Sequence, residues 1–324
     1  MLTVTLRYSI CCYHTKKNGV KVMKIVAVRS DKIYKEMISL SRCEKEDVYR
    51  YKLMKPFEFK WKCINVPLKS EKAVTYDVVS ISSINGWYSP NQIDSKLNSD
   101  IEKISSDKFW KECKNSILKS LSKFEENGIL LPVQNYTFTI LLSDPKNPVS
   151  KMTGDYCGDG GIPGYIIGTV IPNERSLNML PVALAHEANH NVRWQFMKWN
   201  SNITLADMIV SEGLAENFAA LMFGEDKTGI WVRNTSEEML EKVIKPIIKN
   251  NLHENNFNKL SCYLYGDDIM KLRGVKPLNV PYCAGYACGY NLIKYYLKKS
   301  GKSIYEATIM KTDEILKETE EFWN

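Results

Sequence analysis

Two of the four histidines in the chain, His186 and His190, stand four residues apart in the sequence AHEANHNVRW, and Glu187 directly follows the first. Residues four apart lie on the same face of an α-helix, so both imidazole rings could bind one metal ion. Glu187 lies about 100° further round the helix, where it could reach a water molecule beside that ion. The pattern HExxH is typical of zinc sites in which the glutamate acts as a general base.

A zinc ion that activates water needs a third protein ligand and one open position. The sequence SEGLAE, residues 211–216, contains two carboxylates one helical turn apart, Glu212 and Glu216. A second helix after a short connection would bring them back beside the histidines, and their apolar neighbours argue against a solvated helix face. Either glutamate could be the ligand. We favour Glu212, and expect Glu216 to accept a hydrogen bond from the second nitrogen of a ligand histidine.

Amide hydrolysis would also need a donor for the negative charge that develops on the carbonyl oxygen. Tyr286 and Tyr290 are the candidates, because they lie four residues apart and could share a helix face. The alternative interpretation is an aromatic stripe in the core. Arg193, on the same helix as the histidines, is expected to be structural and to pair with a buried carboxylate such as Glu216 or Asp207.

The elements that must position these residues follow from periodicity and capping signals. We predict strands over 24–28, 135–143 and 165–172, and extended segments within 56–85. We predict helices over 30–41, 99–127, 204–223, 236–250, 284–299 and 303–321, and a helix around the histidines that starts near Pro181. The glycine-rich residues 153–164 are predicted to be a loop beside the cleft, and residues 164–172 the sheet edge that binds substrate.

Composition excludes several classes of protein. The chain has 324 residues and a net charge of +7, spread over lysines along its whole length, so we expect no nucleic-acid partner. No apolar run reaches the roughly 18–20 residues of a membrane helix, so we expect no membrane association. The nine cysteines are odd in number and form no disulfide or zinc-knuckle spacing, which favours a reducing, cytoplasmic location.

The motifs together resemble those of known metallopeptidases. HEANH followed by SEGLAE resembles the gluzincins, and with AGYACGYNLIKYYL the two resemble a family of predicted zinc-dependent proteases catalogued as a domain of unknown function. This resemblance covers roughly residues 150–310. It implies an α+β, zincin-like fold: a small mixed sheet over an active-site helix, and a mostly helical C-terminal half. It also implies that His186, His190 and Glu212 bind one Zn²⁺ per chain and that Glu187 is the base.

We therefore expect a zinc-dependent metallohydrolase, a peptidase that cleaves a peptide or protein substrate by Glu187-assisted attack of zinc-bound water. The alternative is a non-catalytic zinc-binding or chaperone-like stress protein that retains the HExxH scaffold. Glu187 speaks against this alternative, because a purely structural site has no use for it. We expect three parts of the chain: an N-terminal extension (1–23), a mixed α/β region (24–128) and a metallopeptidase domain (129–324).

Overall fold

The computed structural model describes residues 23–71, 76–147, 150, 154–198 and 202–324. Its one sheet has four strands in the order β1 (Lys24–Val28), β2 (Asn135–Leu142), β4 (Tyr165–Val170) and β3 (Tyr156–Ile162). The first three strands are parallel, and β3 pairs antiparallel with β4 at one edge. The predicted α+β architecture with a small mixed sheet is confirmed.

Helices make up most of the remaining described chain. Before β2 they are α1 (Ser30–Met37), α2 (Arg42–Val48), α3 (Glu58–Cys63), α4 (Val78–Ile84), α5 (Asn98–Lys103) and α6 (Asp107–Glu126), with a π-helical turn at Tyr49–Met54. After β4 they are α8 (Glu174–Phe196), α9 (Leu205–Phe223), α10 (Ile230–Arg233), α11 (Glu237–Met239), α12 (Lys245–Lys249), α13 (Phe257–Tyr265), α14 (Asp267–Leu272), α15 (Ala284–Ser300), α16 (Ile304–Thr308) and α17 (Thr312–Glu318).

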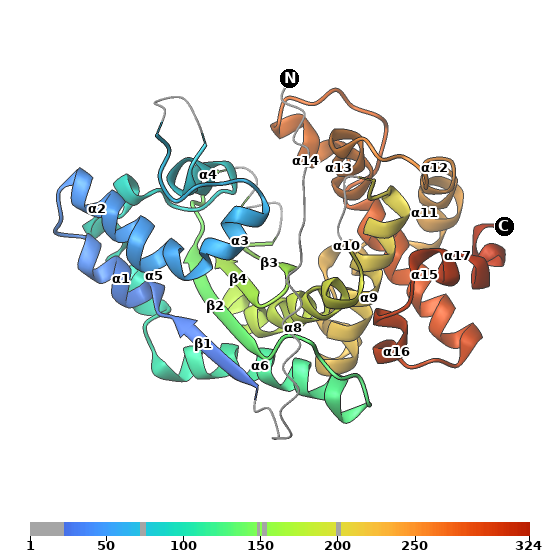
Figure 1. The fold of residues 1–324 in the computed structure, drawn as a ribbon. Coiled ribbons are helices and arrows are strands. Elements are labelled where there is room, and N and C mark those ends of the chain that lie inside the picture. The colour runs from blue at the N-terminus through green and yellow to red at the C-terminus, as the bar shows by residue number, and fades with distance from the viewer. Residues whose placement is uncertain (1–22, 72–75, 148–149, 151–153, 199–201) are drawn as a thin grey trace.

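Helix α8 lies between the two halves of the molecule (Figure 1). It packs against β3 and β4 on the sheet side, and against α6 and α9. Helices α1 to α5 gather beyond the sheet, α6 lies beside α8, and α9 to α17 form the opposite half (Figure 1). Strand β1 precedes residue 128 in the sequence and β2 follows it, yet the two strands pair with each other. The two regions predicted on either side of that residue therefore contribute to one sheet.

The prediction of extended structure within residues 56–85 is wrong. Residues 58–63 form α3 and residues 78–84 form α4. The alternating aromatic residues Phe57, Phe59 and Trp61 suggested a strand, but Phe59 is 59% exposed. Phe57 and Trp61, four residues apart, are both buried, as one face of a helical segment requires.

The predicted glycine-rich loop contains the edge strand β3, so this prediction is also wrong. Gly158 and Gly160, two residues apart on one strand face, lie directly against α8. A Cβ atom at Gly160 would lie 2.2 Å from the carbonyl oxygen of Glu187, so only glycine permits this approach. The edge predicted at residues 164–172 is instead β4, an interior strand.

Capping residues set the ends of the two helices that carry the candidate ligands. Helix α8 begins at Glu174, seven residues before the predicted start, because the Asn173 side chain caps its first turn. Pro181 lies inside this helix. The boundaries of α9 were correctly predicted: Thr204 and Asp207 form a reciprocal capping box, and the helix ends before Gly224.

Helices α9 and α15 touch backbone to backbone at two glycines. A Cβ atom at Gly213 would lie 2.1 Å from the Gly289 carbonyl oxygen, and one at Gly289 would lie 2.3 Å from the Ile209 carbonyl oxygen. Gly213 thus serves the contact with α15, so α15 fixes the position of the helix that carries Glu212.

No helix in the described ranges is long and apolar enough to cross a membrane. Cys43, Cys113, Cys157, Cys262, Cys283 and Cys288 are free thiols in the structure. The predicted N-terminal extension lies outside the described residues except for Met23.

Candidate metal centre

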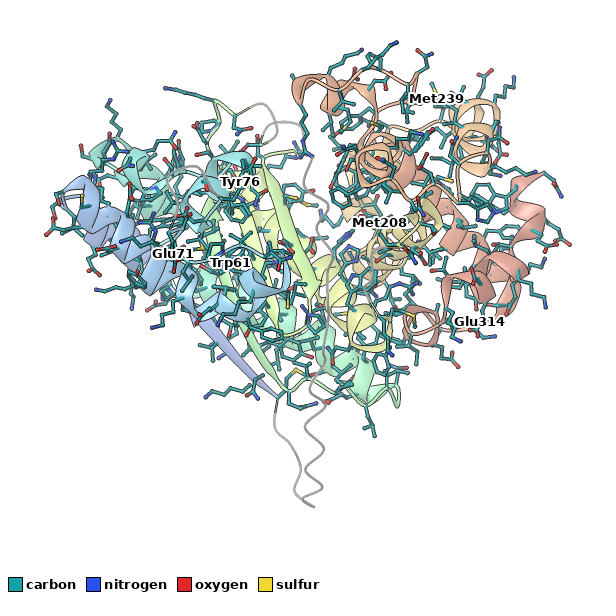
Figure 2. The ribbon with its side chains drawn as sticks, turned by 45° about the horizontal axis from the view of Figure 1, so that its top comes forward. Trp61, Glu71, Tyr76, Met208, Met239 and Glu314 are labelled. Atoms are coloured by element: carbon teal, nitrogen blue, oxygen red, sulfur yellow. The ribbon has the colours of Figure 1, made fainter. Side chains whose placement is uncertain are left out.

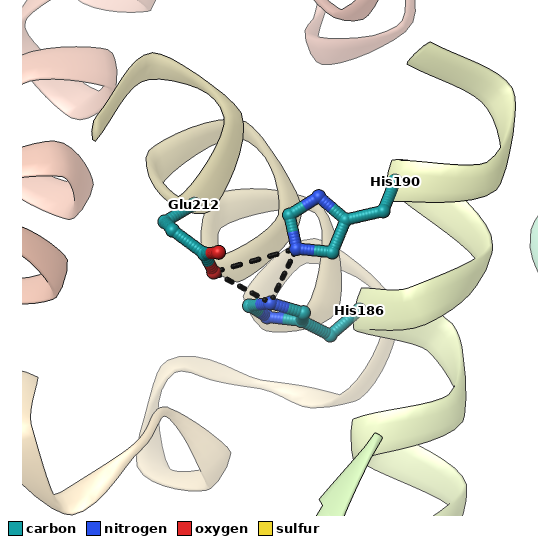
Figure 3. A group of neighbouring side chains, drawn as sticks. All are labelled: His186, His190 and Glu212. Atoms are coloured by element: carbon teal, nitrogen blue, oxygen red, sulfur yellow. Dashed lines mark hydrogen bonds and ion pairs between the residues drawn. The ribbon is translucent and has the colours of Figure 1, made fainter. Parts of the chain in front are cut away.

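Helices α8 and α9 bring three ligand atoms together (Figure 3). Nε2 of His186 lies 3.1 Å from Nε2 of His190 and 3.2 Å from Oε2 of Glu212. Nε2 of His190 lies 3.3 Å from the same carboxylate oxygen. These side chains are 10–12% exposed. Over the residues that the structure describes, no other group of three His, Cys, Asp or Glu side chains is close enough to share a metal ion.

This triangle fits a tetrahedral zinc ion. Nitrogen and oxygen ligands bind zinc at about 2.0–2.1 Å, which places neighbouring ligand atoms about 3.3 Å apart. Two imidazole nitrogens and a carboxylate oxygen that face one point in a buried site need a cation or a shared proton to offset their repulsion. Two histidines and one glutamate are also the donor set of thermolysin-type zinc sites. The residues present therefore fit zinc with one open position.

The outward nitrogen of each histidine has its own partner. Nδ1 of His186 lies 3.2 Å from Oε2 of Glu216, and Nδ1 of His190 lies 3.1 Å from the Ser211 hydroxyl. A proton on each Nδ1 leaves the lone pair of Nε2 directed toward the ligand triangle. Sequence reasoning anticipated a contact of Glu216 with a ligand histidine and missed Ser211. The signal for Ser211 was a single hydroxyl directly before Glu212 in an otherwise apolar helix.

The charges at the site shift the pKa values of its acids and bases. Burial lowers the pKa of His186, but hydrogen bonds to Glu212 and Glu216 outweigh burial and hold it well above its ordinary value. Burial raises the pKa of Glu212, but the charge of His190 and hydrogen bonds with both histidines lower it to about 2. Glu212 is therefore a carboxylate at neutral pH, as a metal ligand must be.

Glu187 lies beside the ligand triangle but is held by strand β3. Its Oε2 accepts a hydrogen bond of 2.7 Å from the Gly160 amide. The β3–β4 register shifts between Asp159 and Ile162, and this bulge turns backbone groups out of the ladder. Burial raises the pKa of Glu187, against the opposing charges of His190 and His186. A raised pKa suits a carboxylate that must accept and then release a proton.

Asn191 fixes β3 on α8, and sequence reasoning did not single it out. Its side-chain amide donates to the carbonyls of Gly160, Ile162 and Tyr165 at 2.9–3.0 Å, and its Oδ1 accepts from the Gly164 amide at 2.8 Å. The side chain is fully buried. A polar residue on the apolar part of the helix was the available signal, since a buried amide needs partners.

An ion pair between a buried lysine and a partly exposed aspartate holds β3 from its other side. Nζ of Lys60 on α3 lies 2.7 Å from Oδ2 of Asp159 on β3, and the Lys60 side chain is 2% exposed. Burial raises the pKa of Asp159, but the nearby charge of Lys60 outweighs it and lowers the pKa. The strand beside Glu187 is thus fixed by groups from both halves of the chain. Sequence reasoning placed Lys60 in an extended segment and did not anticipate this contact.

A cavity of about 430 Å³ adjoins the ligand triangle. Its N-terminal wall, from β3 and the segment directly after α4, includes Asn85, Trp87, Cys157, Gly158, Asp159 and Gly160. Its C-terminal wall includes Lys227, Trp231, Tyr265, Arg273 and Tyr286. Met208 on α9 also lines it, and Figure 2 shows Met208 on the side opposite to Trp61.

The structure brings one of the two candidate tyrosines into this cavity. Tyr286 lines it, next to the missed residue Tyr265, and the centroids of their rings lie 5.8 Å apart. Burial and the charge of Glu212 raise the pKa of Tyr286, so its hydroxyl stays protonated and can donate. Tyr290 lies outside the cavity lining, beneath the ammonium of Lys294.

Arg193 is buried away from the ligand triangle. Its guanidinium donates to the carbonyls of Thr308 and Met310 at 3.0 Å and to the Thr312 hydroxyl at 3.1 Å. It makes no hydrogen bond or ion pair with the carboxylates expected as partners, because α8 presents this face to the loop between α16 and α17. Burial lowers the pKa of Arg193 to about 10. Its contacts fix the end of α8 to the C-terminal helices.

The fold and the site define an α+β protein with a helix-borne His–His–Glu group suited to a metal ion. The chain belongs to the family described as predicted Zn-dependent protease (DUF2268), which matches residues 109–317. YjfC of Bacillus subtilis (strain 168), an uncharacterized protein, is 33% identical over 288 residues, covering 88% of this chain and 95% of YjfC. The uncharacterized protein YjaZ of the same organism is 30% identical over 122 residues, covering 37% and 43%. No solved structure matches the chain.

Proposed function

We propose that this protein is a zinc-dependent metallopeptidase with a zincin-like fold of the gluzincin type. The observation that carries the proposal is the triangle of ligand atoms from His186, His190 and Glu212, with edges of 3.1–3.3 Å, and the Glu187 carboxylate beside it. A structural zinc site has four protein ligands, whereas a catalytic one has three and keeps a position for water. The family description supports the same assignment.

In the proposed mechanism, bound zinc would supply a Lewis acid that polarises the scissile carbonyl and makes water more acidic. Glu187 accepts a proton from the attacking water and delivers it to the leaving amine. The Gly160 amide keeps that carboxylate in place during both transfers. Tyr286 is our candidate donor to the negative charge that develops on the carbonyl oxygen.

The substrate would lie along β3. This strand pairs with β4 on one side only, so its other edge can pair with an extended peptide. Glu216 and Ser211 act through the histidines, whose ring orientations they hold.

Glu187 also separates the proposal from its alternative, a non-catalytic zinc-binding or chaperone-like protein. The first test is the substitution Glu187→Gln, which keeps the shape of the side chain but removes its basicity. We expect about one zinc per chain in the wild type and in this variant, measured by elemental mass spectrometry. Hydrolysis of a mixed peptide pool, followed by mass spectrometry, should fall about 10²- to 10⁴-fold, the usual contribution of a general base.

Glu174→Gln is the matched control, because Glu174 lies exposed in the first turn of the same helix. It should retain both zinc and activity, and His186→Ala should lose both. Absence of zinc from the wild type after zinc is offered would overturn the metal centre. Zinc binding with full hydrolysis in Glu187→Gln would overturn the mechanism, and zinc binding without hydrolysis of any pool would favour the non-catalytic alternative.

A further inference from the structure

The C-terminal wall of the cavity is a continuous row of aromatic rings. The ring centroids of Trp231 and Tyr286 are 5.3 Å apart, and those of Tyr286 and Tyr265 are 5.8 Å apart. The row ends at the guanidinium of Arg273, which lies 5.6 Å from the Tyr265 ring centroid. All four side chains line the cavity. The wall therefore extends from Tyr286, the proposed hydrogen-bond donor to the carbonyl oxygen of the substrate, to the positive charge of Arg273.

Among the described lysine and arginine residues that line the cavity, Lys227 has a carboxylate partner and Arg273 has none. Nζ of Lys227 lies 3.0 Å from Oδ2 of Asp226. Among the described residues, no carboxylate lies within 4.0 Å of Arg273, which is exposed and follows the last residue of α14. Its position is set by the cation–π contact with Tyr265 rather than by an acid of the protein.

We infer that Arg273 is a specificity-determining residue that binds a carboxylate of the peptide substrate. A guanidinium stacked on an aromatic ring keeps its N–H groups free at its edge, where they can bind the two oxygens of a carboxylate. The inference rests on the proposed peptidase function. It narrows the substrate class to peptides with a carboxylate on the C-terminal side of the scissile bond, either the C-terminal group or an acidic side chain.

Four matched versions of a peptide cleaved by the wild type would test this inference. They combine a free or amidated C-terminus with Glu or Gln at the position nearest the cleavage site on its C-terminal side. Removing the recognised carboxylate should lower kcat/KM about 10- to 100-fold, mainly through KM, since a charge-assisted hydrogen bond is lost. Loss on amidation identifies the terminal carboxylate, and loss on the change from Glu to Gln identifies the acidic side chain.

The variant Arg273→Gln should abolish this discrimination, because KM for the carboxylate peptide should rise to that of its neutral counterpart. Arg273→Lys should restore part of the preference through its charge, without the planar contact. Lys271→Gln is the control, because Lys271 carries the same charge on exposed α14 but does not line the cavity. Calorimetric titration of zinc-loaded Glu187→Gln protein with the four peptides gives the same comparison as Kd values.

Equal cleavage and equal binding of all four peptides would overturn the inference, as would a preference that survives in Arg273→Gln. Failure of the proposed function has a different signature. It would appear as absence of zinc, or as zinc-loaded protein that cleaves no peptide pool. If zinc-loaded protein binds the peptides without cleaving them, the Kd comparison still decides whether Arg273 recognises a carboxylate.

Discussion

The two sides of the metal centre are built by different kinds of contact. On the ligand side, α9 meets α15 through glycine backbones at Gly213 and Gly289, with carbonyl oxygens where a Cβ atom would lie. On the strand side, hydrogen bonds attach β3 to α8. The Asn191 side chain donates to the Gly160 carbonyl, and the Glu187 carboxylate accepts from the Gly160 amide. The first contact is purely steric, whereas the second adds separable polar interactions to the close approach of Gly158 and Gly160 to α8.

Because of this difference, we expect metal affinity and catalytic turnover to depend on different contacts. Glu212 lies on the helix that the steric contact positions, so metal affinity should depend on the α9–α15 packing. Glu187 takes its position from β3, so the role as a base that we propose for it should depend on the strand. Substitutions on the two sides should therefore fail in different ways.

The largest effect is expected for Gly213→Ala. Alanine is favoured over glycine in a helix by about 1 kcal/mol. Here, however, the added methyl group would meet the Gly289 carbonyl, and overpacking should lower the free energy of unfolding by about 3 kcal/mol. Urea unfolding and zinc content together check this prediction. An unchanged unfolding midpoint with full zinc content would show that α9 can move away from α15 without harm.

The next effect is expected for Gly160→Ala, which should spare the metal. The methyl group would push β3 away from Glu187, and a displacement of about 1 Å can cost about 100-fold in rate. Zinc content should stay near one per chain while kcat falls. Gly161→Ala is the matched control, because the nearest atom to its Cβ would be 3.9 Å away. Equal activity of the two variants would contradict the role of β3 in placing the base.

The smallest of the three effects is expected for Asn191→Ala, which removes the hydrogen bonds to the β3–β4 turn. Buried backbone groups left without partners should cost about 2 kcal/mol of unfolding free energy. Zinc should still bind, because the ligand triangle does not include this residue. Asn178→Ala, at an exposed position of the same helix, should change stability by less than about 0.5 kcal/mol. A loss of zinc in Asn191→Ala would show that the two sides are coupled.

The sequence predicted the ligand side far better than the strand side. The spacing of His186 and His190 is a local property of a helix, and Thr204 and Gly224 marked both ends of the next one. Glu212 could be placed because a helix pair joined by a short segment has few possible arrangements. Local spacing and capping therefore account for the ligand triangle.

The strand side could not be predicted because its determinants are distant in the sequence. Glycines weaken a strand when considered alone, so residues 156–162 resembled a loop. Gly158 and Gly160 are required only because α8 lies against them. The role of Lys60 likewise depends on its ion pair with Asp159, a contact that forms only when the chain folds. Long-range packing overrode local propensity at each of these positions.

The contact between α9 and α15 has a consequence for the order in which the protein matures on the ribosome. Synthesis proceeds from the N-terminus, so all candidate zinc ligands are translated before Gly289 and the residues of the aromatic wall. A nascent chain that has reached only α9 therefore lacks α15, which holds α9 and its Glu212 in position. It also lacks Arg273, the proposed carboxylate-binding residue. The proposed hydrolytic activity would therefore arise only after α15 has been translated.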